Sequence, residues 1–167
     1  MFSDERLAKW LRLAGPPLHT RSIHVNVSLQ GSQNGKRGSQ EALVLLDSHA
    51  MSAILRSAWV RNAQPPCIRQ RTPTPISDAS GNHISASGLH NTKTVDMAIG
   101  DHTNKMRFDL AYMPPGDLDG YLPMAWLKDH NPDIDCKRRS LKWRSDYCKT
   151  HFLRSKSCIE FITCEKR

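Results

Sequence analysis

Aromatic residues and long apolar runs are both scarce in this sequence of 167 residues. Phe, Trp and Tyr make up 7% of the chain and all hydrophobic residues 38%, and the mean hydropathy is -0.55. No segment approaches the roughly 20 apolar residues that a membrane-spanning helix needs. Asp4 and Glu5 stand where a signal peptide carries basic and apolar residues. We therefore expect a soluble, cytoplasmic protein with one ordinary domain and no membrane contact.

Paired cysteine motifs are also lacking. The five cysteines are an odd number, and none of them forms the Cys-x-x-Cys spacing of zinc and redox sites. Cys148 and His151 stand three residues apart, as in half of a zinc knuckle, but no second pair completes the set. The sequence therefore predicts free thiols in a reducing compartment, with no bound metal and no cofactor.

The two ends of the chain differ from its centre. Residues 1–20 predict a short amphipathic helix and linker, because Ser3 can cap an apolar stripe that stops at Gly15. The formal net charge is +8, and residues 137–167 hold ten Lys or Arg against three acidic residues. We delimit a basic tail at residues 144–167. Such a tail is most often solvated, and weak RNA binding through phosphate contacts is the alternative.

Two adjacent segments predict a hairpin that ends at an aspartate. Residues 23–29 alternate between apolar and polar side chains, which is the period of a strand with one buried face. Residues 31–40 contain mainly polar and turn-forming residues, and residues 42–46 are apolar throughout. We expect the polar stretch to be a loop, and the second strand to be buried on both faces and to end at Asp47.

The rest of the chain predicts further short strands. Residues 76–89 form a polar hairpin candidate centred on Gly81. Residues 94–99 and 106–113 alternate and predict a second hairpin, and residues 121–127 look like a short strand that runs into a helical turn. Four prolines mark a loop that cannot be a central strand, namely Pro65, Pro66, Pro73 and Pro75. The pattern predicts an all-β domain with a short helix.

Asp47 is the first candidate for chemistry. It follows five apolar residues and precedes small or polar ones, so its carboxylate is expected where a buried strand leaves the core. Two carboxylates that share one proton can hydrolyse a peptide, since one activates water while the other donates a hydrogen bond to the scissile carbonyl. A chain with one such aspartate must pair with a second copy, so that a two-fold axis supplies the other carboxylate. The alternative is an aspartate that only caps a helix.

Three blocks in this chain resemble the retropepsin-like aspartic protease domain of a gypsy-type LTR retrotransposon Gag-Pol polyprotein, of the fungal kind. VLLDSHAMSAIL at residues 44–55 is similar to the family's strand with its catalytic aspartate. PISDASGNHISASG at residues 75–88 looks like the flap hairpin. GYLPMAWLKDHNPDIDC at residues 120–136 resembles the second apolar strand with its Trp-Leu helix and His-Asn-Pro sequence. Together the blocks are far more specific than any one of them.

The resemblance implies a protease domain at residues 21–143 with the acid-protease fold, one half of a closed β-barrel that forms a homodimer. Asp47 would be the catalytic carboxylate, Ser48 would make the hydroxyl bond between subunits beneath it, and Ala50 would line the substrate cleft. The flap tip would contact a polypeptide substrate through a run of five residues: Asp78, Ala79, Ser80, Gly81 and Asn82. The implied function is that of a hydrolase, an aspartic endopeptidase that processes its own polyprotein.

The chain also departs from the family's pattern. His49 stands where the family has glycine, and two imidazoles would crowd the paired carboxylates. A protonated imidazole beside Asp47 would also hold that carboxylate ionised, against the shared-proton state. Pro123 and Cys136 replace a common glycine and a common tryptophan. We therefore expect impaired catalysis, with a catalytically silent peptide-binding or RNA-binding remnant as the alternative and a partly folded, degenerate product as a third hypothesis.

Overall fold

The computed structural model describes residues 23–33, 35–78, 80–84, 87–114, 116, 118–143, 145–151 and 158–160. Their strands form a nine-stranded sheet and a three-stranded sheet. The first strands of the large sheet are β1 (His24–Gln33), β2 (Lys36–Asp47), β3 (Ile54–Arg56), β4 (Cys67–Arg69) and β5 (His90–Thr92). The others are β6 (Val95–Ile99), β7 (His102–Met106), β8 (Asp109–Ala111) and β9 (Gly120–Pro123). The prediction of an all-β domain with a short helix is confirmed.

The remaining elements are shorter. The helices are α2 (Ser57–Ala63), α3 (Met124–His130) and α4 (Asp146–His151), and the small sheet contains β10 (Asp133–Asp135), β11 (Ser140–Lys142) and β12 (Cys158–Glu160). The strand running into a helix at residues 121–127 is confirmed by β9 and α3. No helix within the described ranges is long and apolar enough to cross a membrane. The predicted helix and linker at residues 1–20 lies outside the described residues.

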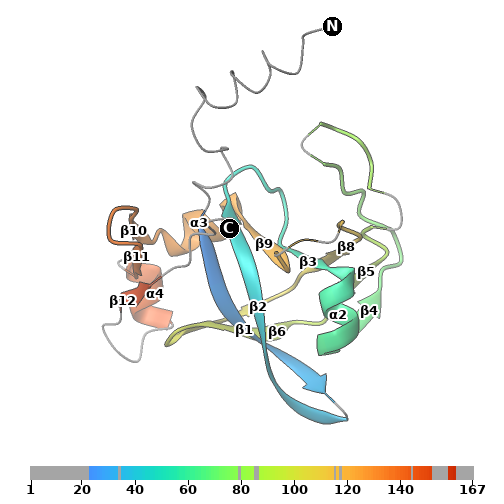
Figure 1. The fold of residues 1–167 in the computed structure, drawn as a ribbon, viewed down its shortest axis with the longest axis horizontal. Helices are drawn as coiled ribbons and strands as arrows, with labels where there is room; N and C mark the ends of the chain where they lie inside the picture. Colours follow the sequence, from blue (N-terminus) through green and yellow to red (C-terminus); the bar gives the residue numbers. More distant parts are fainter. Residues whose placement is uncertain are drawn as a thin grey trace, which may run out of the picture.

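The strands β1 and β2 form one long twisted hairpin, whose tip extends beyond the rest of the sheet in Figure 1. The predicted loop at residues 31–40 is wrong, because the ladder continues to the pair Gln33 and Lys36. Every residue of this polar stretch that joins the ladder gains a cross-strand partner for its backbone, so it needs no apolar side chain to stay extended. Gly35, with a φ of 76°, supplies the positive backbone angle of the turn.

The sequence predicted that the second strand of this hairpin is buried on both faces. This prediction is wrong. Ala42 and Val44 are buried in the core, whereas Leu43, Leu45 and Leu46 are only half-buried. The core covers one face of β2, while the other face of the single chain remains partly open to solvent. A continuous apolar run in the sequence therefore forms a strand whose two faces differ in burial.

The second predicted hairpin exists but uses another return strand. The strand β6 pairs with β7, from Ile99 opposite His102 to Val95 opposite Met106. The predicted partner at residues 106–113 instead contains β8, which pairs in parallel with β3. A tight turn at Gly100, whose φ is 59°, allows β6 and β7 to pair directly on either side of it. The alternation at residues 106–113 reflects a separate strand, so periodicity identified the strand but not its partner.

The strand β9 fixes the position of the end of β2. It pairs in parallel with β2, which sets Asp47 opposite Pro123, and antiparallel with β3, which sets Gly120 opposite Leu55. A Cβ atom at Gly120 would meet the carbonyl oxygen of Ile54, so no larger residue fits this crossing without a shift of the backbone. The end of β2 is thus held by close backbone contact with a strand from the far end of the domain.

Two imidazoles are buried where the small sheet meets the large one. His102 at the start of β7 stacks on Trp143 with ring centroids 4.0 Å apart, and His130 at the end of α3 lies 4.9 Å from His102. Trp126 contacts His130 with ring centroids 4.4 Å apart. The pKa of both imidazoles is lowered to about 4, mainly by burial, and for His130 the neighbouring His102 contributes to this lowering. Both rings are therefore packed in their neutral form.

We predict that the chain loses stability as the pH falls from about 6.5 to about 4. The unfolded imidazoles have a pKa near 6.5 and the folded ones a pKa of about 4, so in this window the unfolded chain binds the protons. Each imidazole removes about 3 kcal/mol over the window, since one pKa unit corresponds to about 1.4 kcal/mol. The loss levels off below the folded pKa. Thermal melting at pH 7.5, 6, 5 and 4.5 measures it.

The matched variant is His130→Phe, which retains an aromatic ring against Trp126 but cannot bind a proton. It should make the melting temperature clearly less dependent on pH between 6.5 and 4. An unchanged slope in this variant would show that other groups cause the acid sensitivity. Carboxylates lose their contribution at lower pH than the imidazoles, so the two effects separate along the pH axis.

Candidate active site

Asp47 lies at the last position of β2, as the sequence predicted. Its carboxylate oxygen Oδ1 accepts a hydrogen bond of 2.8 Å from the backbone N–H of His49, and its carbonyl oxygen accepts one of 3.2 Å from the N–H of Ala50. The side chain is 29% exposed. These bonds turn the chain immediately after the strand and leave part of the carboxylate open to solvent. A charged acid can therefore face outward from the end of a core strand.

The residues after Asp47 form an exposed loop. The Ser48 hydroxyl lies 3.3 Å from Nδ1 of His49. The His49 side chain is 96% exposed, and its Nδ1 lies 3.8 Å from Oδ1 of Asp47. Ala50 is half-buried, and Met51 is almost fully exposed. The structure thus brings Asp47, Ser48 and Ala50 together on one loop and directs the His49 side chain away from the body of the single chain.

Tyr121 is a neighbour of Asp47 that the sequence analysis placed in a strand but not in the site. It pairs across the sheet with Leu45, two residues before Asp47. Its pKa is raised, first by burial and second by the negative charge of Asp47. The phenol is therefore neutral at ordinary pH. The only signal for it in the sequence was its place in the second apolar strand, which does not specify the direction of the ring.

The predicted flap forms the expected small hairpin. Ser77 pairs with His83, and the N–H of Ile84 donates to the carbonyl of Ile76 over 2.8 Å. At the tip, Oδ1 of Asp78 accepts the backbone N–H groups of Ser80 and Asn82 over 2.8 Å and 2.9 Å. These hydrogen bonds lower the pKa of the Asp78 carboxyl, and the bond from the backbone of Asn82 has the largest effect.

The structure describes most of the predicted flap residues and shows how they lie relative to Asp47. Gly81 has a φ of 84°, which suits glycine at the turn. Ala79 lies outside the described residues. Among the residues that the structure does describe, no hydrogen bond links the hairpin tip to Asp47 or Ser48. The tip and the Asp47 loop are thus not joined by a direct hydrogen bond among the described residues.

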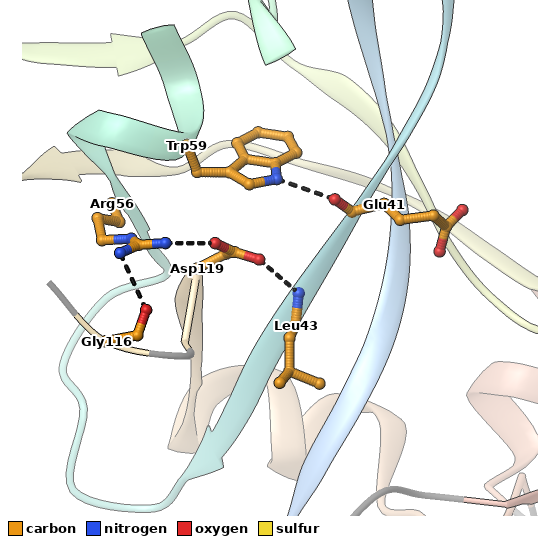
Figure 2. Close-up of polar contacts among 6 residues, drawn as sticks. All are labelled: Glu41, Leu43, Arg56, Trp59, Gly116 and Asp119. Carbon is orange, nitrogen blue, oxygen red and sulfur yellow. Dashed lines mark hydrogen bonds and ion pairs between the residues drawn. The ribbon is translucent and has the colours of Figure 1, made fainter. Parts of the chain in front are cut away.

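A partly buried ion pair lies against β2, as Figure 2 shows. Nη2 of Arg56 lies 2.8 Å from Oδ1 of Asp119, and the two side chains are only 17% and 18% exposed. The other oxygen of Asp119 accepts the backbone N–H of Leu43 over 3.0 Å. The backbones of these three residues are also joined, because Arg56 donates to the carbonyl of Asp119 and Asp119 donates to that of Leu43.

This arrangement, which we call the Arg56–Asp119 clamp, connects β2, β3 and the approach to β9. Arg56 also donates to the carbonyl of Gly116 over 3.0 Å, and the indole N–H of Trp59 on α2 donates to the carbonyl of Glu41 over 2.9 Å (Figure 2). No pattern in the sequence indicated the clamp, since its partners are 63 residues apart. The clamp fixes the strand that carries Asp47 without touching Asp47 itself.

Comparison with known proteins gives a matching family and a number of similar solved structures, two of which are described here. The family model described as the PEG10/RTL1 protease domain matches residues 43–152, which include Asp47, the flap and β9. The retroviral protease-like domain of Ddi1 from Leishmania major is 12% identical with a TM-score of 0.48, over 84% of this chain and 93% of that chain. The protease of EIAV, in complex with the inhibitor HBY-793, is 19% identical with a TM-score of 0.42, over 68% of this chain and 88% of that chain.

Proposed function

Because this chain belongs to the PEG10/RTL1 protease domain family, we propose that it is one half of a homodimeric aspartic endopeptidase, with Asp47 as its catalytic carboxylate and with activity impaired by His49. Membership of the family agrees with the retropepsin-like fold that the sequence predicted. The observation that carries the proposal is the position of Asp47 at the end of β2, oriented by the N–H of His49 and partly open to solvent.

The proposed chemistry needs two copies of Asp47. Two carboxylates brought together by a two-fold axis share one proton, because like charges at such a distance do not both ionise readily. The ionised one takes a proton from water, and the protonated one donates a hydrogen bond to the scissile carbonyl. Within one chain, the described residues place no second carboxylate in contact with Asp47. The half-buried face of β2 is consistent with such an incomplete site.

The other residues of the loop take supporting roles in the proposal. Ser48 makes a hydroxyl bond across the dimer, and Ala50 lines the cleft. The flap hairpin around Gly81 closes over an extended polypeptide and excludes water. A polyprotein of a gypsy-type retrotransposon is the proposed ancestral substrate, and the cytoplasm is the proposed compartment. A basic tail that contacts RNA weakly would keep such a polyprotein near its nucleic acid.

His49 is the reason for proposing impaired activity. Its position is one that the resemblance assigns to glycine, and its side chain projects from the loop that carries Asp47. In a dimer built around the two Asp47 carboxylates, both imidazoles would have to share the same space. Each protonated imidazole would also stabilise an ionised carboxylate and so remove the shared proton. A silent peptide-binding module with the same groove is the second candidate function, and the same observation favours it.

Cleavage of a peptide library by the parent chain and by Asp47→Asn tests the proposal. Asparagine has nearly the same shape as aspartate, so the folded structure should persist while the acid is lost. We expect slow cleavage by the parent that rises with protein concentration, and none by the variant. Cleavage that survives in Asp47→Asn would refute the proposed site. Peptide binding without cleavage in either chain would favour the silent module.

A further inference from the structure

The exposed loop after β2 carries two side chains that are both metal ligands. Oδ1 of Asp47 and Nδ1 of His49 lie 3.8 Å apart. Zinc binds imidazole nitrogen and carboxylate oxygen at about 2.0–2.2 Å, so two such ligands at a tetrahedral angle stand about 3.4 Å apart. The observed separation is close to that value, and the exposed imidazole is free to make the small adjustment. The spacing is therefore compatible with two ligands of one tetrahedral ion.

A second chain would supply the other two ligands. Within one chain, the described residues contain no group of three or more potential ligands. The two-fold axis of the proposed homodimer, which brings the two Asp47 residues together, brings the two His49 residues to the same place. Two carboxylates and two imidazoles would then surround one point. Ligand spacing along one chain predicted no metal, because that spacing does not report ligands supplied by a second chain.

We propose that Asp47 and His49 of two chains bind one divalent transition metal ion of the zinc class. This inference rests on the dimer of the proposed function. Two adjacent carboxylates repel each other and are relieved either by a shared proton or by a cation. With glycine after Ser48, only the carboxylates would be present; with histidine, two nitrogen ligands are added. Imidazole ligands favour zinc, copper or nickel over magnesium and calcium, which prefer oxygen.

The bound ion would change what the site can do. It would link two chains through four side chains, so it would favour the dimer by mass action. It would also engage both carboxylates, so that neither can accept a proton from water nor donate a hydrogen bond to a substrate. The metal-bound dimer would be assembled but silent, and a chelator would restore whatever activity His49 permits. Metal affinity would rise with pH, because protons compete for the imidazoles.

Cobalt titration of the full chain at pH 7.5 tests this site. Co²⁺ replaces Zn²⁺ and gives strong visible absorption when tetrahedral, and sedimentation reports the assembly state in the same samples. We expect one ion for every two chains, displacement by Zn²⁺, and a shift from monomer to dimer on metal addition. His49→Gly should weaken binding by more than about 100-fold, since loss of a mere supporting contact already costs about 10–100-fold. His90→Asn, which removes an exposed imidazole from β5, should bind like the parent.

Three results would overturn the site: one ion bound per chain, equal affinity in His49→Gly and parent, or metal bound by chains that remain monomers. Because absorption and sedimentation need no substrate, failure here is distinct from failure of the proposed function. An active protease without the cobalt signal would leave the peptidase and remove the metal site. A cobalt-linked dimer that never cleaves peptides, even after chelation, would leave the metal site and remove the peptidase.

Discussion

Replacing His49 with glycine is expected to raise kcat/KM for peptide cleavage by at least about 100-fold, because general acid–base catalysis by a correctly protonated pair contributes about 10²–10⁴-fold. The change removes two imidazoles from the dimer centre and allows the two Asp47 carboxylates to share one proton. The loop itself should retain its shape, since the hydrogen bond to Oδ1 of Asp47 comes from the backbone N–H at position 49 and not from the side chain.

The measurement is cleavage of a peptide that the parent chain cuts slowly, from pH 5 to 8, in the presence of a chelator. The control is His90→Asn, which should leave kcat/KM unchanged. The double variant Asp47→Asn with His49→Gly should be inactive. If His49→Gly were no more active than the parent, the imidazole would not be the cause of impairment. The silent module would then be the better description of the chain.

Replacing Asp119 with alanine is expected to lower the free energy of unfolding by about 1–3 kcal/mol, because it leaves the partly buried guanidinium of Arg56 without its counter-charge. The ion pair is short at 2.8 Å and mostly shielded from water. The variant also removes the side-chain acceptor of the Leu43 N–H on β2. Its effect should reach the Asp47 loop, because the Arg56–Asp119 clamp fixes the strand that ends there.

Urea denaturation of Asp119→Ala and Asp96→Ala measures this effect. Asp96 and Lys105 form an ion pair of the same 2.8 Å length, but both side chains are well exposed, so their separation should cost only about 0–1 kcal/mol. The difference between the two variants isolates burial. A double variant Arg56→Met with Asp119→Leu should recover much of the loss, since well-packed apolar residues often replace a buried ion pair. Equal losses in the two single variants would contradict the account of the clamp.

Local patterns in the sequence predicted the parts of the fold that depend on them. The alternation before Leu29 and the apolar run before Asp47 gave the two strands of the main hairpin, because side-chain periodicity reports which face is buried. The turn at Gly81 and the helix around Trp126 followed from turn chemistry and spacing. The polar residues between Gly31 and Gln40 led to the wrong prediction of a loop. Cross-strand hydrogen bonds can extend a strand that has no apolar face.

The site was predictable only where one residue sufficed. The neighbours of Asp47 in sequence predicted its place at the end of a strand, which the structure confirms, while its catalytic role stays a prediction. The Arg56–Asp119 clamp, the approach of Tyr121 and the buried pair of His102 and His130 depend on contacts between distant segments. A charged or titratable residue gives no sign in the sequence of which partner it will meet. Histidines in particular are expected at the surface or in a site, and burial among tryptophans comes only from the tertiary fold.

The central claim is that one active site is built from the Asp47 residues of two chains, and a mixing experiment tests it most directly. His49→Gly chains are held at a fixed concentration while chains carrying both Asp47→Asn and His49→Gly are added in increasing excess, with time for exchange. A shared site predicts that cleavage falls toward zero, because each active chain becomes paired with an inactive one. Cleavage that stays constant as the inactive chain is added would show that each chain works alone, and would contradict the account.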